Sequence, residues 1–497
     1  MSTNPNLLPN TPLSQVQDQA LLKTDALING EWVGSNERFE VDDPATGQVL
    51  AKVARLGALH ADAAIHAANQ AWPAWRSKTA KERAALLMRW FQLMHQHADD
   101  LARIMTAEQG KPVGEAKGEV GYAASFVEWF AEEARRIYGE TIPSNDPSKR
   151  FLVLKQPIGV CAAITPWNFP LAMITRKVAP ALAAGCPVVI KPAEQTPLSA
   201  LALAELAQRA GFPPGVLNVL SSDSAGSIEI GNVLCASDVV RHLSFTGSTE
   251  VGRILMKQCA PTIKKLSLEL GGNAPFIVFD DADIDAAVEG AIASKYRNAG
   301  QTCVCANRFY VQDGVYDEFV AKLAQRVGQM KTGNGFEPGV AIGALIDDAA
   351  VAKVQQHVQD ALDKGGRVLT GGAASGRLYQ PTVLADAKAG MLCAKEETFG
   401  PVAPVFRFKT EAEAIQLANN TEFGLASYFF SRDVGRIFRV GEALEYGMVG
   451  INTGLMSAAE APFGGVKQSG LGREGSHHGI DDYVEIKYLC LGGITQP

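Results

Sequence analysis

Basic runs and long uninterrupted apolar segments are both missing from this sequence. Its 46 Lys and Arg residues are outnumbered by 53 Asp and Glu residues, which gives a formal net charge of −7 and argues against a nucleic acid as a main partner. The longest uncharged stretch, residues 156–175, contains Pro157, Pro166 and Pro170, and proline interrupts a membrane-spanning helix. We therefore expect no nucleic-acid partner and no membrane partner.

Targeting signals, a disulfide framework and metal-binding motifs are missing as well. The first 19 residues are polar, rich in proline and asparagine, and contain no basic residue, unlike a secretory or transit peptide. Eight cysteines are scattered through 497 residues, which fits a reducing compartment. Because no CxxC or HExxH spacing occurs, we predict no catalytic metal, and we expect a cytoplasmic protein.

The order of apolar segments indicates an α/β protein. At 47% hydrophobic and 20% charged residues, the composition is that of a soluble globular chain, and the length allows roughly three domains. From Gly159 onward, short apolar runs at 159–165, 187–191, 216–220 and 241–245 alternate with helical patterns. This alternation predicts a parallel, doubly wound sheet with ligands at the carboxyl ends of its strands. A second alternating block starts at Leu266.

The two ends of the chain show other patterns. Residues 1–22 are expected to form a flexible tail. Helices are predicted at 61–75, 79–108 and 113–138, the second opened by a capping box of Thr79 and Glu82. Near the C-terminus, residues 482–490 alternate polar and apolar side chains after a glycine-rich loop. We predict a strand there that pairs away from its own domain.

Cys303 is the candidate nucleophile. It follows an Asn-Ala-Gly-Gln-Thr turn at the end of a helical pattern over residues 284–299, and its small, polar neighbours keep the thiol reachable. An isolated cysteine is more often a small buried apolar residue, so the assignment depends on partners elsewhere in the chain. Cys305 is equally consistent with packing and with a reversible disulfide to Cys303.

Two further polar residues follow apolar strands. Glu269 precedes Gly271 and Gly272, and a buried carboxylate with a raised pKa suits a general base. A lone glutamate more commonly caps a turn. Asn168 lies between Pro166 and Pro170, where its amide would stabilise an oxyanion or simply form part of a rigid turn.

Two strand ends are candidates for a dinucleotide. Residues 246–252 open a helix, where backbone amides and the helix dipole favour a phosphate. Their sequence is neither GxGxxG nor a P-loop, so an ordinary turn is an equal alternative. Lys191 and Glu194 follow another strand and would hold ribose hydroxyls. Glu194 would repel a 2′-phosphate, which favours NAD and leaves NADP as the alternative.

Arg176 and Arg297 are candidates for binding a substrate carboxylate. A guanidinium binds a carboxylate in bidentate fashion. Taken singly, each arginine is more often part of a surface salt bridge. The two positive charges together favour a substrate that carries a carboxylate.

Taken together, these stretches resemble the aldehyde dehydrogenase superfamily from about residue 25 to residue 492. The matching motifs are Pro-Trp-Asn-Phe-Pro at 166–170, Lys-Pro-Ala-Glu at 191–194, Phe-Thr-Gly-Ser at 245–248, Leu-Glu-Leu-Gly-Gly at 268–272, Gly-Gln-Thr-Cys at 300–303, Glu-Glu-Thr-Phe-Gly-Pro at 396–401 and Pro-Phe-Gly-Gly-Val-Lys-Gln-Ser-Gly at 462–470. Residues 173–177, 273–280, 303–305 and 470–476 are most similar to the succinate-semialdehyde dehydrogenases. Ala344 departs from the usual proline, in a loop away from the chemistry.

The resemblance implies a role for each matching position. Cys303 would be the nucleophile, Glu269 the general base, and Asn168 with the Cys303 amide the oxyanion hole. The distal carboxylate of the substrate would be held by Arg176, Arg297 and Ser457. The dinucleotide would be bound by Trp167, Lys191, Pro192, Ala193, Glu194, Gly247, Ser248, Thr249, Glu250, Val251, Gly252 and Glu397.

The resemblance also implies a fold, an activity and an assembly. We expect a Rossmann-like NAD-binding domain over residues 23–142 and 156–265, an α/β catalytic domain over 266–475, and β oligomerisation segments at 143–155 and 476–497 of a homodimer or homotetramer. The expected reaction is NAD(P)-dependent oxidation of succinate semialdehyde to succinate, with glutarate semialdehyde as the alternative substrate. A CoA-acylating dehydrogenase is the alternative enzyme class, and Glu269 argues against it. A non-enzymatic relative would be expected to lack Cys303 or Glu269.

Overall fold

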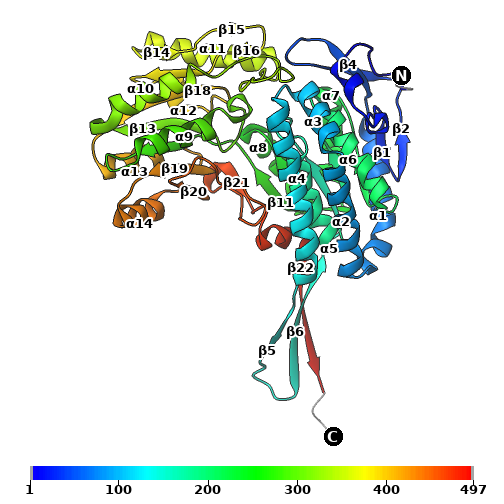
Figure 1. The fold of residues 1–497 in the computed structure, drawn as a ribbon. Coiled ribbons are helices and arrows are strands. Elements are labelled where there is room, and N and C mark those ends of the chain that lie inside the picture. The colour runs from blue at the N-terminus through cyan, green and yellow to red at the C-terminus, as the bar shows by residue number, and fades with distance from the viewer. Residues whose placement is uncertain (1–3, 494–497) are drawn as a thin grey trace.

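The computed structural model describes residues 4–493 and contains two α/β bodies and a narrow projecting sheet (Figure 1). The first body is built on an eight-stranded sheet in the order β2-β1-β9-β8-β7-β10-β11-β21. Its central strands, from β9 to β11, are parallel, which confirms the doubly wound sheet. The strands are β1 (Ala26–Ile28), β2 (Glu31–Val33), β7 (Val160–Ile164), β8 (Val188–Lys191), β9 (Leu217–Val219), β10 (Val240–Thr246), β11 (Lys265–Glu269) and β21 (Gly470–Leu471).

Helices cover both faces of this sheet, because its buried strands present apolar side chains in both directions. On β8, Val188 and Ile190 pack into one apolar cluster while Val189 packs into another on the opposite face. The helices of this body are α1 (Ala58–Ser77), α2 (Ala80–Gln96), α3 (Ala98–Gln109), α4 (Val113–Glu133), α5 (Ala172–Ala184), α6 (Pro197–Ala210), α7 (Ser224–Ala236) and α8 (Thr249–Cys259). Of these, α2, α3 and α4 pack on α5 and α6 and form an outer layer.

The N-terminal segment departs from two predictions. Residues 79–108 form two helices, because the backbone leaves helical geometry at His97 (φ −104°, ψ 21°). The Asp100 carboxylate on α3 accepts hydrogen bonds from the backbone N–H groups of Gln17 and Asp18 at 2.8 and 2.9 Å. Leu13 and Leu21 are buried in the core. The flexible tail predicted for residues 1–22 is therefore wrong for residues 4–22, and residues 1–3 lie outside the described part.

The second body is built on a seven-stranded sheet in the order β14-β17-β18-β13-β12-β19-β20. Its strands are β12 (Ala274–Val278), β13 (Ala306–Gln312), β14 (Arg367–Thr370), β17 (Thr382–Ala385), β18 (Val402–Phe408), β19 (Ala426–Phe430) and β20 (Met448–Ile451). Its helices are α9 (Ile284–Lys295), α10 (Tyr316–Val327), α11 (Asp348–Asp363), α12 (Leu392–Lys395), α13 (Glu411–Asn419) and α14 (Val434–Ala443). Two short hairpins complete the fold, β3 (Arg38–Asp42) with β4 (Val49–Ala54) and β15 (Ala374–Ser375) with β16 (Leu378–Tyr379).

The boundary predicted between residues 265 and 266 is wrong, because it cuts through a strand of the first sheet. β11 pairs in parallel with β10, with Thr246 opposite Glu269, and β21 pairs with the other edge of β11. The chain crosses to the second sheet only after Glu269, through Gly271 and Gly272. Glu269 therefore stands at the carboxyl end of a strand in the first body, facing the second.

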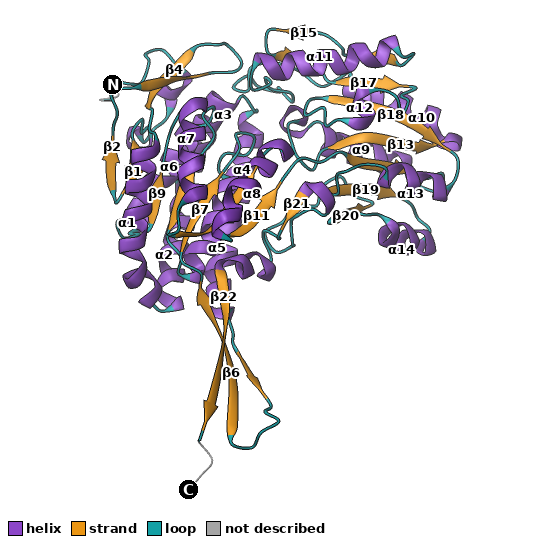
Figure 2. Cartoon of the chain, turned by 180° about the vertical axis from the view of Figure 1, so that it is seen from behind, coloured by secondary structure: helices purple, strands orange, loops and turns teal. Residues whose placement is uncertain are grey.

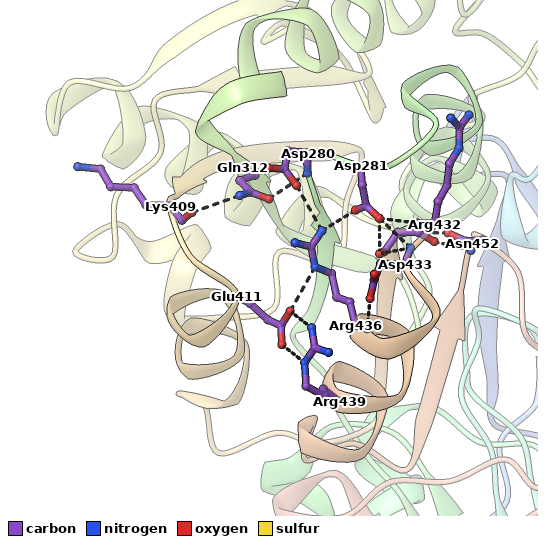
Figure 3. Close-up of polar contacts among 11 residues, drawn as sticks. Asp280, Asp281, Gln312, Lys409, Glu411, Arg432, Asp433, Arg436, Arg439 and Asn452 are labelled. Carbon is purple, nitrogen blue, oxygen red and sulfur yellow. Dashed lines mark hydrogen bonds and ion pairs between the residues drawn. The ribbon is translucent and has the colours of Figure 1, made fainter.

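Helix α14 is attached to the second body mainly by charge, since Val440 is its only buried residue. Figure 3 shows Arg436 between three carboxylates, at 2.6 Å from Asp281, 3.2 Å from Glu411 and 3.3 Å from Asp280. Its guanidinium also lies 4.6 Å from the centre of the Phe279 ring. Single surface ion pairs contribute little, but this shared network ties α14 to the residues that follow β12, beside the apolar contacts of Val440 and Ile437.

The third element is an antiparallel sheet of β5 (Glu140–Ile142), β6 (Lys149–Pro157) and β22 (Val484–Gly492). Figures 1 and 2 show it projecting from the body. It overlaps the predicted segments 143–155 and 476–497 but starts earlier, and residues 477–483 instead pack on the body as a 3-10 helix that buries Ile480 and Tyr483. Residues 494–497 lie outside the described part. Within residues 4–493, no helix is long and apolar enough to cross a membrane.

Candidate active site

Cys303 stands after a turn whose backbone is unusual. Asn298, Ala299 and Gly300 have φ values of 51°, 53° and 75°, and left-handed non-glycine residues cluster at functional sites. A Cβ at Gly300 would lie 2.2 Å from the Gly400 carbonyl oxygen, so only glycine fits there. The turn is fixed by the Asn298 backbone N–H, which donates to the Glu115 carboxylate at 2.8 Å. Cys303 itself is half-buried.

The Cys303 side chain lines a cavity of about 290 Å³ between the two bodies. Burial raises the pKa of its thiol to about 12, and the positive charge on Arg176 acts in the opposite direction. The cavity brings Cys303 together with predicted residues from distant parts of the chain. They are Trp167, Asn168, Gly247, Ser248 and Glu397, joined by Lys353 and Phe399, which the sequence did not single out.

Asn168 lies in the loop between β7 and α5 and is held from three sides. Its backbone oxygen accepts hydrogen bonds from Lys111 Nζ at 2.8 Å and from Asn298 Nδ2 at 2.9 Å. Its own Nδ2 donates to the Gln301 carbonyl at 3.1 Å. The side-chain amide therefore faces the turn that carries Cys303, with one N–H left for a further acceptor.

Glu269 is buried at the end of β11, and neither carboxylate oxygen has a hydrogen-bond partner within the described chain. Burial raises its pKa well above the usual value, and the neighbouring Glu474 raises it further. A Cβ on Gly464 would lie 2.8 Å from Glu269 Oε1, so the carboxylate packs against that loop. Glu269 is not among the residues that line the 290 Å³ cavity, although its charge acts on the Cys303 thiol.

Glu474 is a buried residue that sequence reasoning did not assign. It forms ion pairs with both Arg176 and Lys177 of α5. Lys177 Nζ also donates to Ser244 Oγ at 3.1 Å. Arg176 is thus partly neutralised by an internal carboxylate, while its guanidinium stacks 4.3 Å from the centre of the Phe463 ring.

The three residues predicted to hold a substrate carboxylate come from separate elements but share one neighbour. Arg176 lies on α5, Arg297 follows α9, and Ser457 lies in the loop after β20. Ser457 and Arg176 interact with the hydroxyl of Tyr122, a residue of α4 that the sequence did not single out, and the charge of Arg297 also acts on it. Arg297 lines a separate cavity of about 750 Å³, and none of the three predicted residues lines the cavity that holds Cys303.

The predicted dinucleotide residues follow β8 and β10. Lys191 Nζ lies 3.3 Å from Glu194 Oε2, and the Glu194 side chain is 31% exposed. Pro192 and Ala193 are buried in the turn between these two residues. In the other turn, Ser248 caps α8 by accepting a hydrogen bond from the Val251 N–H at 3.3 Å.

The α8 turn and Glu397 form a cradle that fits a dinucleotide. A Cβ at Gly247 or Gly252 would lie 2.4 Å from the Phe245 ring or 2.5 Å from Leu270, so both glycines are packed closely against apolar side chains, and Gly247 lines the cavity with Glu397. Thr249 donates to the Gln468 carbonyl at 3.4 Å, while Glu250 and Val251 are exposed. Burial raises the pKa of Glu397 to about 7. Its Oε1 is buried without a partner in residues 4–493, as expected of a ligand-binding group.

Comparisons with known proteins agree with this arrangement. The model of the "Aldehyde dehydrogenase family" matches residues 32–489. The chain is 64% identical to the succinate-semialdehyde dehydrogenase [NADP(+)] of Escherichia coli, over 96% of this chain and all of the relative. It is also 64% identical to a glutarate-semialdehyde dehydrogenase of Pseudomonas putida, over 96% of this chain and 99% of the relative.

A solved structure of succinate-semialdehyde dehydrogenase from Burkholderia pseudomallei superposes with a TM-score of 0.95 at 62% identity, covering 96% of this chain and all of that one. The fold predicted from the motifs is therefore confirmed over nearly the whole chain. This protein belongs to the aldehyde dehydrogenase family.

Proposed function

We propose that this protein oxidises succinate semialdehyde to succinate, with a nicotinamide dinucleotide as the hydride acceptor. The observation that carries the proposal is the cavity that Cys303 shares with Trp167, Gly247, Ser248 and Glu397. It offers a nucleophile and a nucleotide cradle in one space. Arg176 and Ser457, which interact with Tyr122, and the charge of Arg297 supply the preference for a carboxylate at the far end of the substrate.

The first half of the reaction takes place at Cys303. Its thiol proton passes to solvent water, and the sulfur forms a bond to the aldehyde carbon while the carbonyl π electrons move to oxygen. Asn168 Nδ2 and the Cys303 backbone N–H stabilise the oxyanion, and losing one such donor typically costs about 100- to 1,000-fold in rate. A dinucleotide held by the turn at Gly247 and Ser248 and by Glu397 would supply the two-electron acceptor for the hydride of the former aldehyde carbon. A thioester on Cys303 remains.

Glu269 acts as the general base in the second half of the reaction, the hydrolysis of the thioester. Its carboxylate takes a proton from a water molecule whose oxygen forms a bond to the thioester carbon. The carbon–sulfur bond then breaks, which releases the carboxylic acid and restores Cys303. The raised pKa of Glu269 suits this role, because a base is most effective when its pKa lies near the working pH. A CoA-acylating enzyme transfers the acyl group to the thiol of coenzyme A and not to water. A base that activates water therefore argues against that enzyme class.

We propose NAD as the preferred cofactor, although the similar E. coli relative carries NADP(+) in its name. The half-exposed Glu194 carboxylate stands at the end of β8 beside Lys191, where it would repel a 2′-phosphate. Glu194→Ser is expected to raise the ratio of kcat/KM with NADP to kcat/KM with NAD by about 10- to 100-fold. Glu289→Ser, an exposed glutamate of the second body, is the matched control. An unchanged ratio in Glu194→Ser would exclude this role.

The substrate is tested by comparing kcat/KM for succinate semialdehyde, glutarate semialdehyde and uncharged butanal. Contacts to a charged group predict that succinate semialdehyde is favoured over butanal by about 10- to 100-fold. One methylene changes affinity by about 1–3 kcal/mol, so the two semialdehydes should differ less sharply. Arg297→Gln should reduce the preference over butanal, while Arg432→Gln, at an exposed pair with Asp283, should not. Equal efficiency on butanal would remove the carboxylate pocket from this proposal.

We also propose that the projecting sheet is an oligomerisation element of a homodimer or homotetramer. Ile486 and Tyr488 on β22 are 71% and 55% exposed, and exposed apolar strands tend to pair with other chains. Sedimentation equilibrium tests this, since a 52.9 kDa species alone would contradict it.

All eight cysteines are free thiols, which supports a reducing, cytoplasmic setting.

A further inference from the structure

Lys111 and Glu119 form an ion pair inside the first body, and both side chains are only 1% exposed. Taking two charges out of water is costly, and an apolar pair of similar size is often at least as stable. Stability alone therefore does not account for this pair. Its hydrogen bonds show what else it does, because all of them lead to the loop that carries Asn168.

Glu119 lies on α4 and binds the start of α5. Its Oε1 accepts hydrogen bonds from the backbone N–H groups of Leu171 and Ala172 at 2.9 and 3.3 Å. Its Oε2 accepts a hydrogen bond from Lys111 Nζ. The carboxylate therefore fixes the segment that follows Asn168 relative to α4.

The Lys111 ammonium binds the same loop at Asn168 itself. Nζ donates to the Asn168 carbonyl oxygen at 2.8 Å and lies 4.1 Å from the centre of the Phe169 ring. The same oxygen accepts a second hydrogen bond from Asn298 Nδ2 at 2.9 Å. Because two donors use both lone pairs of this oxygen, the orientation of the peptide group after Asn168 is fixed.

This peptide group sets the direction of the Asn168 side chain, since both are attached to the same Cα. The side-chain amide is also fixed at both ends. Its Nδ2 donates to the Gln301 carbonyl at 3.1 Å, and its Oδ1 accepts from the Phe169 N–H at 3.1 Å. Gln301 lies two residues before Cys303. A continuous series of hydrogen bonds thus runs from Glu119 to the turn that carries the nucleophile.

We infer that Lys111 and Glu119 are positioning residues, which hold the amide of Asn168 where the oxyanion forms. This inference rests on the proposed function, because it needs Asn168 to act as an oxyanion donor. Neither Lys111 nor Glu119 lines the cavity that holds Cys303, so both act through Asn168 and not on the substrate. A catalytic group displaced by about 1 Å loses about 100-fold in rate, which sets the size of the expected effect.

The test replaces both residues at once. Lys111→Met alone would leave a buried carboxylate unpaired and would destabilise the fold. Lys111→Met combined with Glu119→Gln, the pair variant, removes both charges and keeps an oxygen for the start of α5. The rate constant of the NADH burst at saturating substrate should fall about 10- to 100-fold, because the oxyanion is stabilised mainly in the transition state. The substrate concentration that gives half of the maximal burst rate should stay the same.

A second background distinguishes positioning from a general loss of structure. In Asn168→Ala the donor is already gone, so the pair variant should change the burst rate constant by less than about twofold there. The Asn168 carbonyl remains in that background, so the loss of stability should be the same as in the parent enzyme. A rate constant for one turnover does not depend on the fraction of enzyme that is folded.

Lys264→Met is the matched control. Lys264 is a buried lysine of the same body, and its Nζ donates to the backbone carbonyls of Leu234, Ser237 and Val240. None of these four residues lines the cavity that holds Cys303. The control should lower the free energy of unfolding and leave the burst rate constant unchanged. An equal fall of the rate constant in Lys264→Met would overturn the inference.

The outcomes separate this inference from the proposed function. If Asn168→Ala slows the burst and the pair variant keeps the parental rate constant, the proposed function stands and the positioning role is wrong. The same conclusion follows if the pair variant slows the burst by an equal factor in the parent and in Asn168→Ala. If Asn168→Ala itself keeps the parental rate constant, Asn168 is not the oxyanion donor, and the inference fails together with that part of the mechanism.

Discussion

Cys303→Ala is expected to abolish aldehyde oxidation, with a loss of kcat on the order of 10⁴-fold or more, as is typical when a covalent nucleophile is removed. Both the steady-state formation of NADH and the first-turnover burst should disappear, because no thiohemiacetal forms and no hydride leaves the aldehyde carbon. The measurement is NADH absorbance after rapid mixing, with enzyme at micromolar concentration so that one turnover is visible.

Cys305→Ala is the matched control for this experiment. Cys305 is buried, and its thiol donates to the Lys295 carbonyl at 3.4 Å, whereas the Cys303 thiol faces the cavity. The control variant should keep the burst and most of the steady-state rate. Mass spectrometry of quenched turnover should find the acyl group on the Cys303 peptide. Turnover by Cys303→Ala, or an acyl group on Cys305, would contradict the assignment.

The thiol of Cys303 is protonated in the ligand-free protein. Burial raises its pKa to about 12 in the ligand-free protein, so the thiol is protonated at pH 7. The proton must therefore leave during the reaction, helped by the positive charge of Arg176. This is compatible with a nucleophile that is activated only when substrate and cofactor are in place.

The sequence predicted regular elements well where local pattern decides them. The apolar runs predicted at 159–165, 187–191, 216–220 and 241–245 are the strands β7, β8, β9 and β10, each bound within one residue, because each run ends at a clear turn signal. The flexible tail was wrong because nothing local marks Leu13 and Leu21 as core residues. They pack into the main apolar cluster, and Asp100 of α3 accepts hydrogen bonds from the backbone between them. The boundary at Leu266 was wrong for the same reason, since pairing between β10 and β11 is a long-range property.

The site shows the same division between local and long-range information. Motifs identified Cys303, Asn168 and Glu397, and the cavity brings these three together. Tyr122 and Glu474 were not assigned, because a tyrosine in a helix and a glutamate in a glycine-rich loop carry no signal of their own. Their importance comes from Arg176, which contacts both residues from a third element.

Glu269→Gln is expected to give a burst of about one NADH per active site, followed by a steady-state rate reduced about 100- to 10,000-fold. The substitution keeps the shape of the side chain but removes the base that activates water, so the thioester should accumulate on Cys303. The burst is measured by stopped flow, and the accumulated thioester by mass spectrometry. Glu133→Gln replaces another buried glutamate, on α4 beside Arg136, and should leave both phases unchanged.

The pH dependence supplies an independent check on Glu269. Burial and the nearby Glu474 raise its pKa, and only the deprotonated form is a base. The deacylation rate of the parent enzyme should therefore rise with pH through that raised pKa and level off above it, and Glu269→Gln should lose this dependence. Parental turnover in Glu269→Gln would refute the assignment. Loss of the burst itself would mean that Glu269 acts before hydride transfer, as the acceptor of the Cys303 proton.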